Sequence, residues 1–319
     1  MRKILRILSI CVLLILPVSA AEAEYLVPVG KLIGLQLQSD TVTVAAFDDA
    51  LGNNARAAGL RIGDELVTVN GVPIRRACDV TGALEKGGMV TLCVRRGGKE
   101  KVLRFTAADD GDGPRLGVYL RQGIAGVGTV TWYDPEEGTF GALGHGVAGG
   151  RGTLLNMTEG YAYDATIQSV IPGKPGVPGQ LKGASDVNDL WGQLTRNTHR
   201  GVFGTTQVVP HTGAIPVADW EQIHTGPATI RSTVTADGPR DYRVEIVRLY
   251  DENRTDGRNF LLKITDLDLL AITGGIVQGM SGSPILQDGK IVGAVTHVLV
   301  NDPTMGYGIF IENMLEAAG

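Results

Sequence analysis

Short runs of alternating apolar and polar residues dominate the sequence, and this period of two is typical of half-buried β-strands. The clearest runs near the N-terminus cover 32–37, 41–47 and 102–105. Later runs, separated by Gly and Pro, cover 127–133, 162–170, 242–249, 260–264 and 291–299. Only the segments 54–58 and 78–86 favour short helices. The pattern therefore predicts a mainly β protein with many tight turns.

The composition supports this prediction and excludes several classes of protein. Glycine accounts for 45 of the 319 residues, or 14%, about double the usual share. The hydrophobic content of 43% is enough to form a buried core and excludes a wholly disordered chain. The net charge of −5 provides no basic surface, so we expect no nucleic-acid partner. The length favours two domains over one.

The first 23 residues have the layout of an export signal. Arg2, Lys3 and Arg6 precede an apolar run over 7–16, and small residues follow at 18–23. This layout is typical of a signal peptide, although the segment could also remain as a membrane anchor. No second hydrophobic span follows it. We therefore expect residues 1–23 to be a signal peptide or anchor, and the rest of the chain to work outside the cytoplasm.

Residues 30–107 resemble a PDZ domain. The resemblance rests on NARAAGLRIGDELVTVNGVPI and on the hairpin VTLCVRRGGKEKVLRF. It implies that Ile33, Gly34 and Leu35 form the loop that holds a peptide carboxylate, while an extended peptide C-terminus adds a strand to the sheet. The alternative is a small β domain that only packs on its neighbour. Cys78 and Cys93 in this region could form one disulfide or remain reduced.

A polar, turn-rich segment at 109–114 predicts a domain boundary, and patterned sequence resumes over 115–319. The strongest chemical motif in this second part is Gly279-Met280-Ser281-Gly282-Ser283-Pro284. Glycines flanking a serine allow a tight turn that exposes the hydroxyl and directs backbone N–H groups to one point. The motif resembles the nucleophile region of chymotrypsin-like proteases, with Ser283 in place of a glycine. We expect Ser281 as nucleophile and the backbone of Gly279 and Ser281 as oxyanion hole.

A serine nucleophile needs a base with a pKa near neutrality, and the sequence offers five histidines. His145, in Leu143-Gly144-His145-Gly146, is the best candidate, because His199, His211 and His224 lie in polar, loop-like sequence. His297 and Thr296 fall on the strand after the nucleophile, where an edge strand would contact substrate.

The third member of a catalytic triad is a carboxylate that orients the imidazole. Asp266 ends an apolar strand 15 residues before Ser281, Asp164 follows His145 by 19 residues, and Asp134 is a further alternative. The residues alone leave this choice open.

Together these motifs resemble the SpoIVB-type serine peptidases of endospore-forming bacteria. The likeness is carried by TFGALGHGV and by the long stretch LLKITDLDLLAITGGIVQGMSGSPILQDGKIVGAVTHV. It implies a PDZ-like domain followed by a chymotrypsin-like double β-barrel, with His145, Asp266 and Ser281 as catalytic residues. In chymotrypsin-like folds the triad Asp lies well before the Ser, so Asp266 departs from that geometry.

The same resemblance implies a sporulation protease, secreted from the forespore into the space between its two membranes. There it would cleave a membrane-embedded regulatory protein and so trigger processing of a sigma factor. No cofactor or metal is expected, because the sequence contains no H-E-x-x-H motif that would favour a metal-dependent hydrolase. The main alternative is a non-catalytic PDZ-type adaptor or scaffold at the membrane surface.

Overall fold

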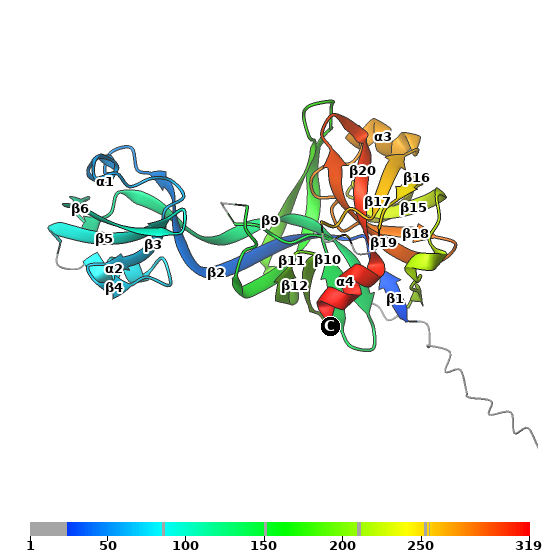
Figure 1. The fold of residues 1–319 in the computed structure, drawn as a ribbon, viewed down its shortest axis with the longest axis horizontal. Helices are drawn as coiled ribbons and strands as arrows, with labels where there is room; N and C mark the ends of the chain where they lie inside the picture. Colours follow the sequence, from blue (N-terminus) through cyan, green and yellow to red (C-terminus); the bar gives the residue numbers. More distant parts are fainter. Residues whose placement is uncertain (1–23, 85–86, 150–151, 209–211, 252–253, 255) are drawn as a thin grey trace, which may run out of the picture.

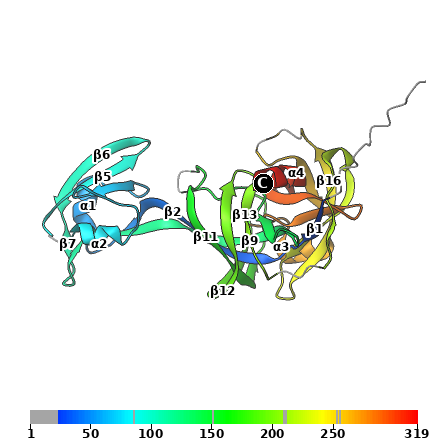
Figure 2. The same ribbon diagram turned by 90° about the horizontal axis from the view of Figure 1, so that it is seen from below.

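Two long strands, β2 (Leu32–Phe47) and β9 (Val118–Asp134), run through both parts of the molecule in the computed structural model (Figure 1). They pair antiparallel, from Leu32 opposite Thr129 to Phe47 opposite Val118. One end of this ribbon belongs to a small N-terminal unit, and the other end belongs to a pair of β-barrels (Figures 1 and 2). The structure describes residues 24–84, 87–149, 152–208, 212–251, 254 and 256–319. The predicted export segment 1–23 lies outside these described residues.

The N-terminal unit is a sheet covered by short helices. Its strand order is β9–β2–β3–β5–β6, and β4 pairs with β3. Its core joins apolar side chains of the strands, such as Val44, Leu66 and Leu92, to Val80 and Leu84 of one helix. Both cysteine thiols are free, and Cys78 is exposed. The remaining elements of the unit are α1 (Asn53–Ala57), β3 (Glu65–Val69), β4 (Val72–Pro73), α2 (Asp79–Leu84), β5 (Met89–Arg96), β6 (Lys99–Thr106), β7 (Ala108–Asp109) and β8 (Pro114–Arg115).

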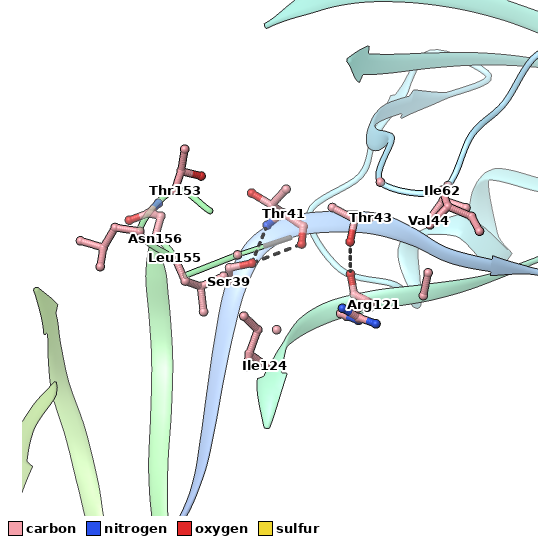
Figure 3. A pocket seen from close by; sticks show the side chains of 15 residues that line it. Ser39, Thr41, Thr43, Val44, Ile62, Arg121, Ile124, Thr153, Leu155 and Asn156 are labelled. Atoms are coloured by element: carbon pink, nitrogen blue, oxygen red, sulfur yellow. Dashed lines mark hydrogen bonds between the residues drawn. The ribbon is translucent and has the colours of Figure 1, made fainter. Parts of the chain in front are cut away.

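The ribbon is interrupted between the two parts of the molecule. The register passes from Gln38 opposite Gly123 to Thr43 opposite Arg121, so four residues of β2 face a single residue of β9. A pocket of about 290 Å³ lies beside this bulge, between the N-terminal unit and the loop that carries Thr153, Leu155 and Asn156 (Figure 3). Among the described residues of its lining, Arg121 is the only charged one, and none is a histidine or a carboxylate.

The first barrel is closed by the pairing of β2 with β9. Starting from β9, the ring continues through β10, β13, β12 and β11 and returns to β2. Ile33, Leu37, Val130 and Phe140 are buried inside it. The further strands of this barrel are β10 (Thr139–Ala142), β11 (Met157–Ile171), β12 (Gln180–Thr198) and β13 (Gly201–Thr205).

The second barrel is closed by six antiparallel strands in the order β15–β16–β17–β20–β19–β18. Its interior is formed by residues such as Ile230, Val244, Phe260 and Ile285, all of them buried. The helix α3 (Leu267–Thr273) follows β17. The strands are β15 (Gly226–Thr233), β16 (Pro239–Leu249), β17 (Phe260–Ile264), β18 (Pro284–Gln287), β19 (Lys290–Leu299) and β20 (Asp302–Phe310).

Short segments at both ends of the chain join the two barrels. β1 (Tyr25–Pro28) pairs with β9 and with β14 (Ile215–Pro216), and η1 (Trp220–Gln222) follows β14. The C-terminal helix α4 (Ile311–Ala318) buries Ile311 and Met314 in a cluster with Trp132 of the first barrel and Ile291 of the second. No helix within the described ranges is long and apolar enough to cross a membrane.

The mainly β, double-barrel fold predicted from the sequence is confirmed. The domain boundaries differ from the predicted 30–107 and 115–319. Residues 32–38 belong to the first barrel, and Leu116, Val118 and Leu120 pack on the core of the N-terminal unit. The reason is that β2 and β9 each continue from one part into the other, so no single cut between 107 and 115 separates them.

Candidate active site

His145 follows the strand β10 on the first barrel, at the end of a sharp turn. Leu143 and Gly144 both have positive φ, 70° and 66°, and a Cβ on Gly144 would lie 2.9 Å from Thr296 of the second barrel. A left-handed backbone is uncommon for leucine, so packing between the barrels holds this turn. The turn places the half-buried His145 ring against the second barrel.

The His145 ring is oriented by a backbone carbonyl. Its Nδ1 lies 3.1 Å from the carbonyl oxygen of Gly146. Since a carbonyl only accepts hydrogen bonds, Nδ1 carries the proton and the neutral ring leaves Nε2 as a free acceptor. Burial lowers the pKa of His145 below its ordinary value, against a smaller opposite effect of the Gly146 carbonyl. The tautomer is therefore the one that a general base requires.

Asn197 fixes the loop that follows His145, a role that sequence reasoning missed. Its side-chain oxygen accepts from the Val147 amide at 2.9 Å, and its side-chain nitrogen donates to the carbonyls of Val147 and Leu155, each at 2.9 Å. A single Asn near the end of a polar strand gives no local signal of such a role.

Ser281 lies in the loop between α3 and β18 of the second barrel. Gly274, with φ 70°, ends α3, and the backbone then turns through Gly279, with φ 101°, to the serine. The Ser281 hydroxyl donates to the carbonyl of Thr296 at 2.9 Å. The amides of Gly279 and Ser281 donate to no other residue of the described chain. Both N–H groups are thus free to bind a developing oxyanion.

Thr129 of β9 holds this loop from the first barrel and was also missed by sequence reasoning. Its amide donates to the carbonyl of Ser281 at 3.0 Å, and its hydroxyl donates to the carbonyl of Gly279 at 2.8 Å. Gly282, with φ 94°, lies so close that a Cβ there would collide with the Thr129 carbonyl. The glycine after the nucleophile is therefore required by the contact between barrels as well as by its turn.

His145 and Ser281 line one cleft between the two barrels. The cleft has a volume of about 400 Å³ and also contains Gln278 and Gly279. No hydrogen bond joins the Ser281 hydroxyl to His145 in this structure, because the hydroxyl is bonded to Thr296. The fold nevertheless brings both predicted residues to the same cavity.

The predicted edge strand lies beside these residues. β19 pairs with β18 only as far as Ala294, so the segment 296–299 has one edge without a paired strand among the described elements. The His297 ring packs on His145, with ring centroids 5.3 Å apart, and its Nδ1 is buried without a hydrogen-bond partner in the described chain. Burial, followed by the charges of His145 and Arg258, lowers the pKa of His297 to about 4. A substrate contact by Thr296 and His297 stays a prediction.

Asp266 does not orient His145 in this structure, which corrects the predicted triad. One carboxylate oxygen accepts from the amides of Asp268 and Leu269, each at 3.1 Å, and caps the N-terminus of α3. The other accepts from the Arg243 amide at 3.2 Å. Burial alone would raise the pKa of Asp266, but the amides of Leu269, Arg243 and Asp268 and the charge of Arg243 together outweigh it and hold the pKa below its usual value. An aspartate before a helix is drawn to the free N–H groups of the first turn.

The two alternative carboxylates are also engaged elsewhere. Asp164 on β11 forms an ion pair with Lys31 at 2.7 Å, and Asp134 accepts from the amides of Glu136 and Glu137 in the turn after β9. The charge of Asp256 raises the pKa of His297, although burial and the charges of His145 and Arg258 outweigh it. Its own oxygens, however, bind the Arg254 guanidinium at 3.0 and 2.6 Å.

The model of the family described as SpoIVB peptidase S55 matches residues 113–315, which is more than half of the chain. The chain belongs to the SpoIVB peptidase S55 family. It is a serine peptidase. Its N-terminal unit lies mostly outside the matched region.

Two solved protease structures match this SpoIVB-family peptidase at low sequence identity. The Rv3671c protease of M. tuberculosis H37Rv, in an inactive form, is 12% identical, with 60% of this chain and 84% of that chain covered and a TM-score of 0.35. The HtrA-type protease AlgW with a decapeptide is 14% identical, with coverage of 66% and 57% and a TM-score of 0.38. Among curated proteins, none matches the sequence.

The predicted carboxylate-binding loop of the PDZ-like unit is not at Ile33, Gly34 and Leu35. These residues pair with β9 on one side and with β11 on the other, as part of the first barrel of the SpoIVB-family peptidase. Ile33 is fully buried, and a Cβ on Gly34 would collide with Ser185. No strand edge is left there for a peptide. The apolar pattern of 32–37 is the same for an edge strand and a barrel strand, so the sequence could not separate them.

A groove in the N-terminal unit has the two features that were expected at Gly34, namely an unpaired strand edge and free backbone N–H groups. It measures about 280 Å³ and lies between α2, with Val80, Thr81 and Leu84, and the segment 115–120. Over 118–121 β9 pairs with β2 on one edge, and no described strand pairs with its other edge. The amides of Leu116 and Gly117 donate to no other described residue. An unpaired edge beside a helix can accept an extended peptide.

Proposed function

We propose that this SpoIVB-family peptidase cleaves peptide bonds with Ser281 as nucleophile and His145 as general base. The observation that carries the proposal is their meeting at one cleft from two different barrels, beside the free amides of Gly279 and Ser281. The hydroxyl passes its proton to Nε2 of His145 as Oγ attacks the carbonyl carbon. The two amides then stabilise the oxyanion, and each such donor contributes about 3 kcal/mol to transition-state stabilisation.

The carbonyl of Gly146 takes over the orienting role that a triad carboxylate has elsewhere. It fixes the Nδ1–H tautomer of His145, which is the first task of the aspartate in a Ser-His-Asp triad. Before reaction the Ser281 hydroxyl must leave its bond to Thr296, so substrate binding and alignment of the catalytic pair are linked.

We further propose the substrate and place of action that the family resemblance implies. The substrate is a membrane-embedded regulatory protein, and cleavage occurs in the forespore intermembrane space, where it triggers sigma-factor processing. The export-like segment 1–23 supports an extracytoplasmic or membrane-associated location. The groove beside α2 would hold a peptide C-terminus, with its carboxylate on the amides of Leu116 and Gly117. It would thereby raise the local concentration of substrate.

The test uses the full chain and the extracytoplasmic part of a membrane-anchored regulator. We expect Ser281→Ala and His145→Ala each to lower turnover by about six orders of magnitude, and the double variant to be no worse, because the two act as a unit. A fluorophosphonate probe should label wild type and not Ser281→Ala. Cleavage that persists in Ser281→Ala would contradict the proposal.

The groove has its own test. Thr81→Trp fills it from α2, so we expect loss of binding to a peptide with a free C-terminal carboxylate, measured by fluorescence anisotropy. The same peptide with a C-terminal amide should bind weakly to wild type. If the probe fails to label wild type while the carboxylate peptide binds, the adaptor function is the better description.

A further inference from the structure

Ser281 is one of the residues that line the cleft between the barrels, and this lining is mostly apolar. Leu35 and Leu37 of β2 and Ile124 and Val127 of β9 line it. The loop that carries His145 and Val147 lines it as well. Among the described residues that line it, His145 is the one titratable side chain.

The chemistry of acyl transfer tells which side of a substrate occupies this space. After Oγ of Ser281 attacks, the protonated base must deliver its proton to the amine that departs. The leaving group therefore lies beside Nε2 of His145. The cleft is built around the loop of His145, whereas none of the residues 296–299 of the unpaired β19 edge lines it. The cleft thus accommodates the part of the substrate that leaves as the amine, and not the acyl part.

We propose that this cleft binds a large apolar side chain on the leaving-group side of the scissile bond. This inference rests on the proposed function and specifies its substrate class, namely peptides with residues such as Leu or Phe directly after the cleaved bond. Apolar walls favour such side chains because binding removes apolar surface of both the side chain and the cleft from water. The catalytic cleft then selects substrate independently of the peptide groove in the N-terminal unit.

Gly126 offers a way to change the cleft without disturbing the fold. It lines the cleft opposite Leu35 on β2, and a Cβ at this position meets no atom within 4 Å. Gly126 is exposed, and its φ lies outside the left-handed range that disfavours side chains. Gly126→Leu would therefore fill the cleft itself. The neighbouring Ala125 is exposed, does not line the cleft and points to the other face of the strand, which makes Ala125→Leu the matched control.

The experiment compares kcat/KM of the full chain on peptides that differ only in the residue after the scissile bond, with the cleaved bond located by mass spectrometry. For wild type and Ala125→Leu we expect a rise of about ten- to a hundredfold from Gly to Leu. In Gly126→Leu this rise should vanish or invert. Gly126→Ala should fall between the two, and fluorophosphonate labelling at the wild-type rate shows that each variant retains its site.

Three outcomes overturn the inference. If kcat/KM of wild type is the same for all peptides of the series, the cleft does not discriminate between residues on the leaving-group side. An equal loss on every peptide in Gly126→Leu, with normal probe labelling, shows the same. If wild type cleaves no peptide, or if Ser281→Ala cleaves as well as wild type, the proposed function fails and this inference fails with it.

Discussion

Ser281 and Ser283 are two residues apart and have opposite surroundings. Ser281 lines the cleft, whereas Ser283 is fully buried and donates to the hydroxyl of Ser232 at 2.9 Å. We expect Ser283→Ala to lower the free energy of unfolding by about 1–3 kcal/mol, because Ser232 is left without this partner in the barrel interior. Probe labelling should remain, and chemical denaturation gives the stability. Loss of labelling in Ser283→Ala, with retention in Ser281→Ala, would move the nucleophile.

The histidine pair predicts an acid-tolerant enzyme. His145 works as a base only when it is neutral, and burial lowers its pKa below the ordinary imidazole value. We therefore expect the acid limb of kcat/KM to have its midpoint below the usual pKa of about 6.5. A pH–rate profile on a short peptide measures this. A midpoint above that value would show that a negative charge, such as that of Asp256, stabilises the imidazolium during catalysis.

His297 affects stability in the same pH range. Its pKa is about 4 in the folded protein and near 6.5 in the unfolded chain, so between these values the unfolded chain takes up a proton that the folded protein does not. The Tm should fall as the pH is lowered from about 6.5 to about 4. His297→Asn should show a smaller fall over this window in differential scanning fluorimetry. An identical fall in both proteins would assign the effect to other groups.

At the scale of elements, α3 connects Asp266 to the nucleophile loop. Asp266 caps its N-terminus, and Gly274 at its other end leads into the loop of Gly279 and Ser281. Asn caps helices about as well as Asp. Asp266→Asn should therefore retain most of the activity, whereas Asp266→Ala should lose about 0.5–2 kcal/mol of stability.

Kinetics and unfolding of the same two variants decide between a cap and a triad member. A loss of about 10⁴-fold in kcat for Asp266→Asn, with unchanged stability, would restore Asp266 to the triad. Asp164→Asn is the matched comparison, since its carboxylate is paired with Lys31 at 2.7 Å.

At the scale of the whole molecule, β2 and β9 link the N-terminal unit to the catalytic barrels. Gly34 lies on the barrel part of β2, where a side chain would collide with Ser185. We expect Gly34→Val to disrupt the first barrel and to lower cleavage of protein and short-peptide substrates alike, with a lower Tm. Selective loss on the protein substrate, at wild-type Tm, would return the peptide site to Gly34.

Many of the strands and the two candidate catalytic residues could be predicted from local sequence patterns. Alternation predicted the strands 260–264 and 291–299, which the structure places at Phe260–Ile264 and Lys290–Leu299. Glycine-flanked Ser281 and His145 were found because tight turns require particular residues at neighbouring positions. Both lie on the cleft. Two strands predicted at 32–37 and 41–47, however, are one continuous strand with a bulge.

What the sequence determined by itself was the local information: strand period, turn residues and the candidate nucleophile and base. Only the tertiary structure decided what Asn197 does, since its partners Val147 and Leu155 lie 50 and 42 residues away in the chain. For Asp266 the helix cap is local, but its bond to the Arg243 amide comes from a distant strand. The same holds for Gly34, because an apolar strand has one pattern whether its edges are free or paired. Thr129 became part of the site only through the contact between barrels, which no period in the sequence encodes.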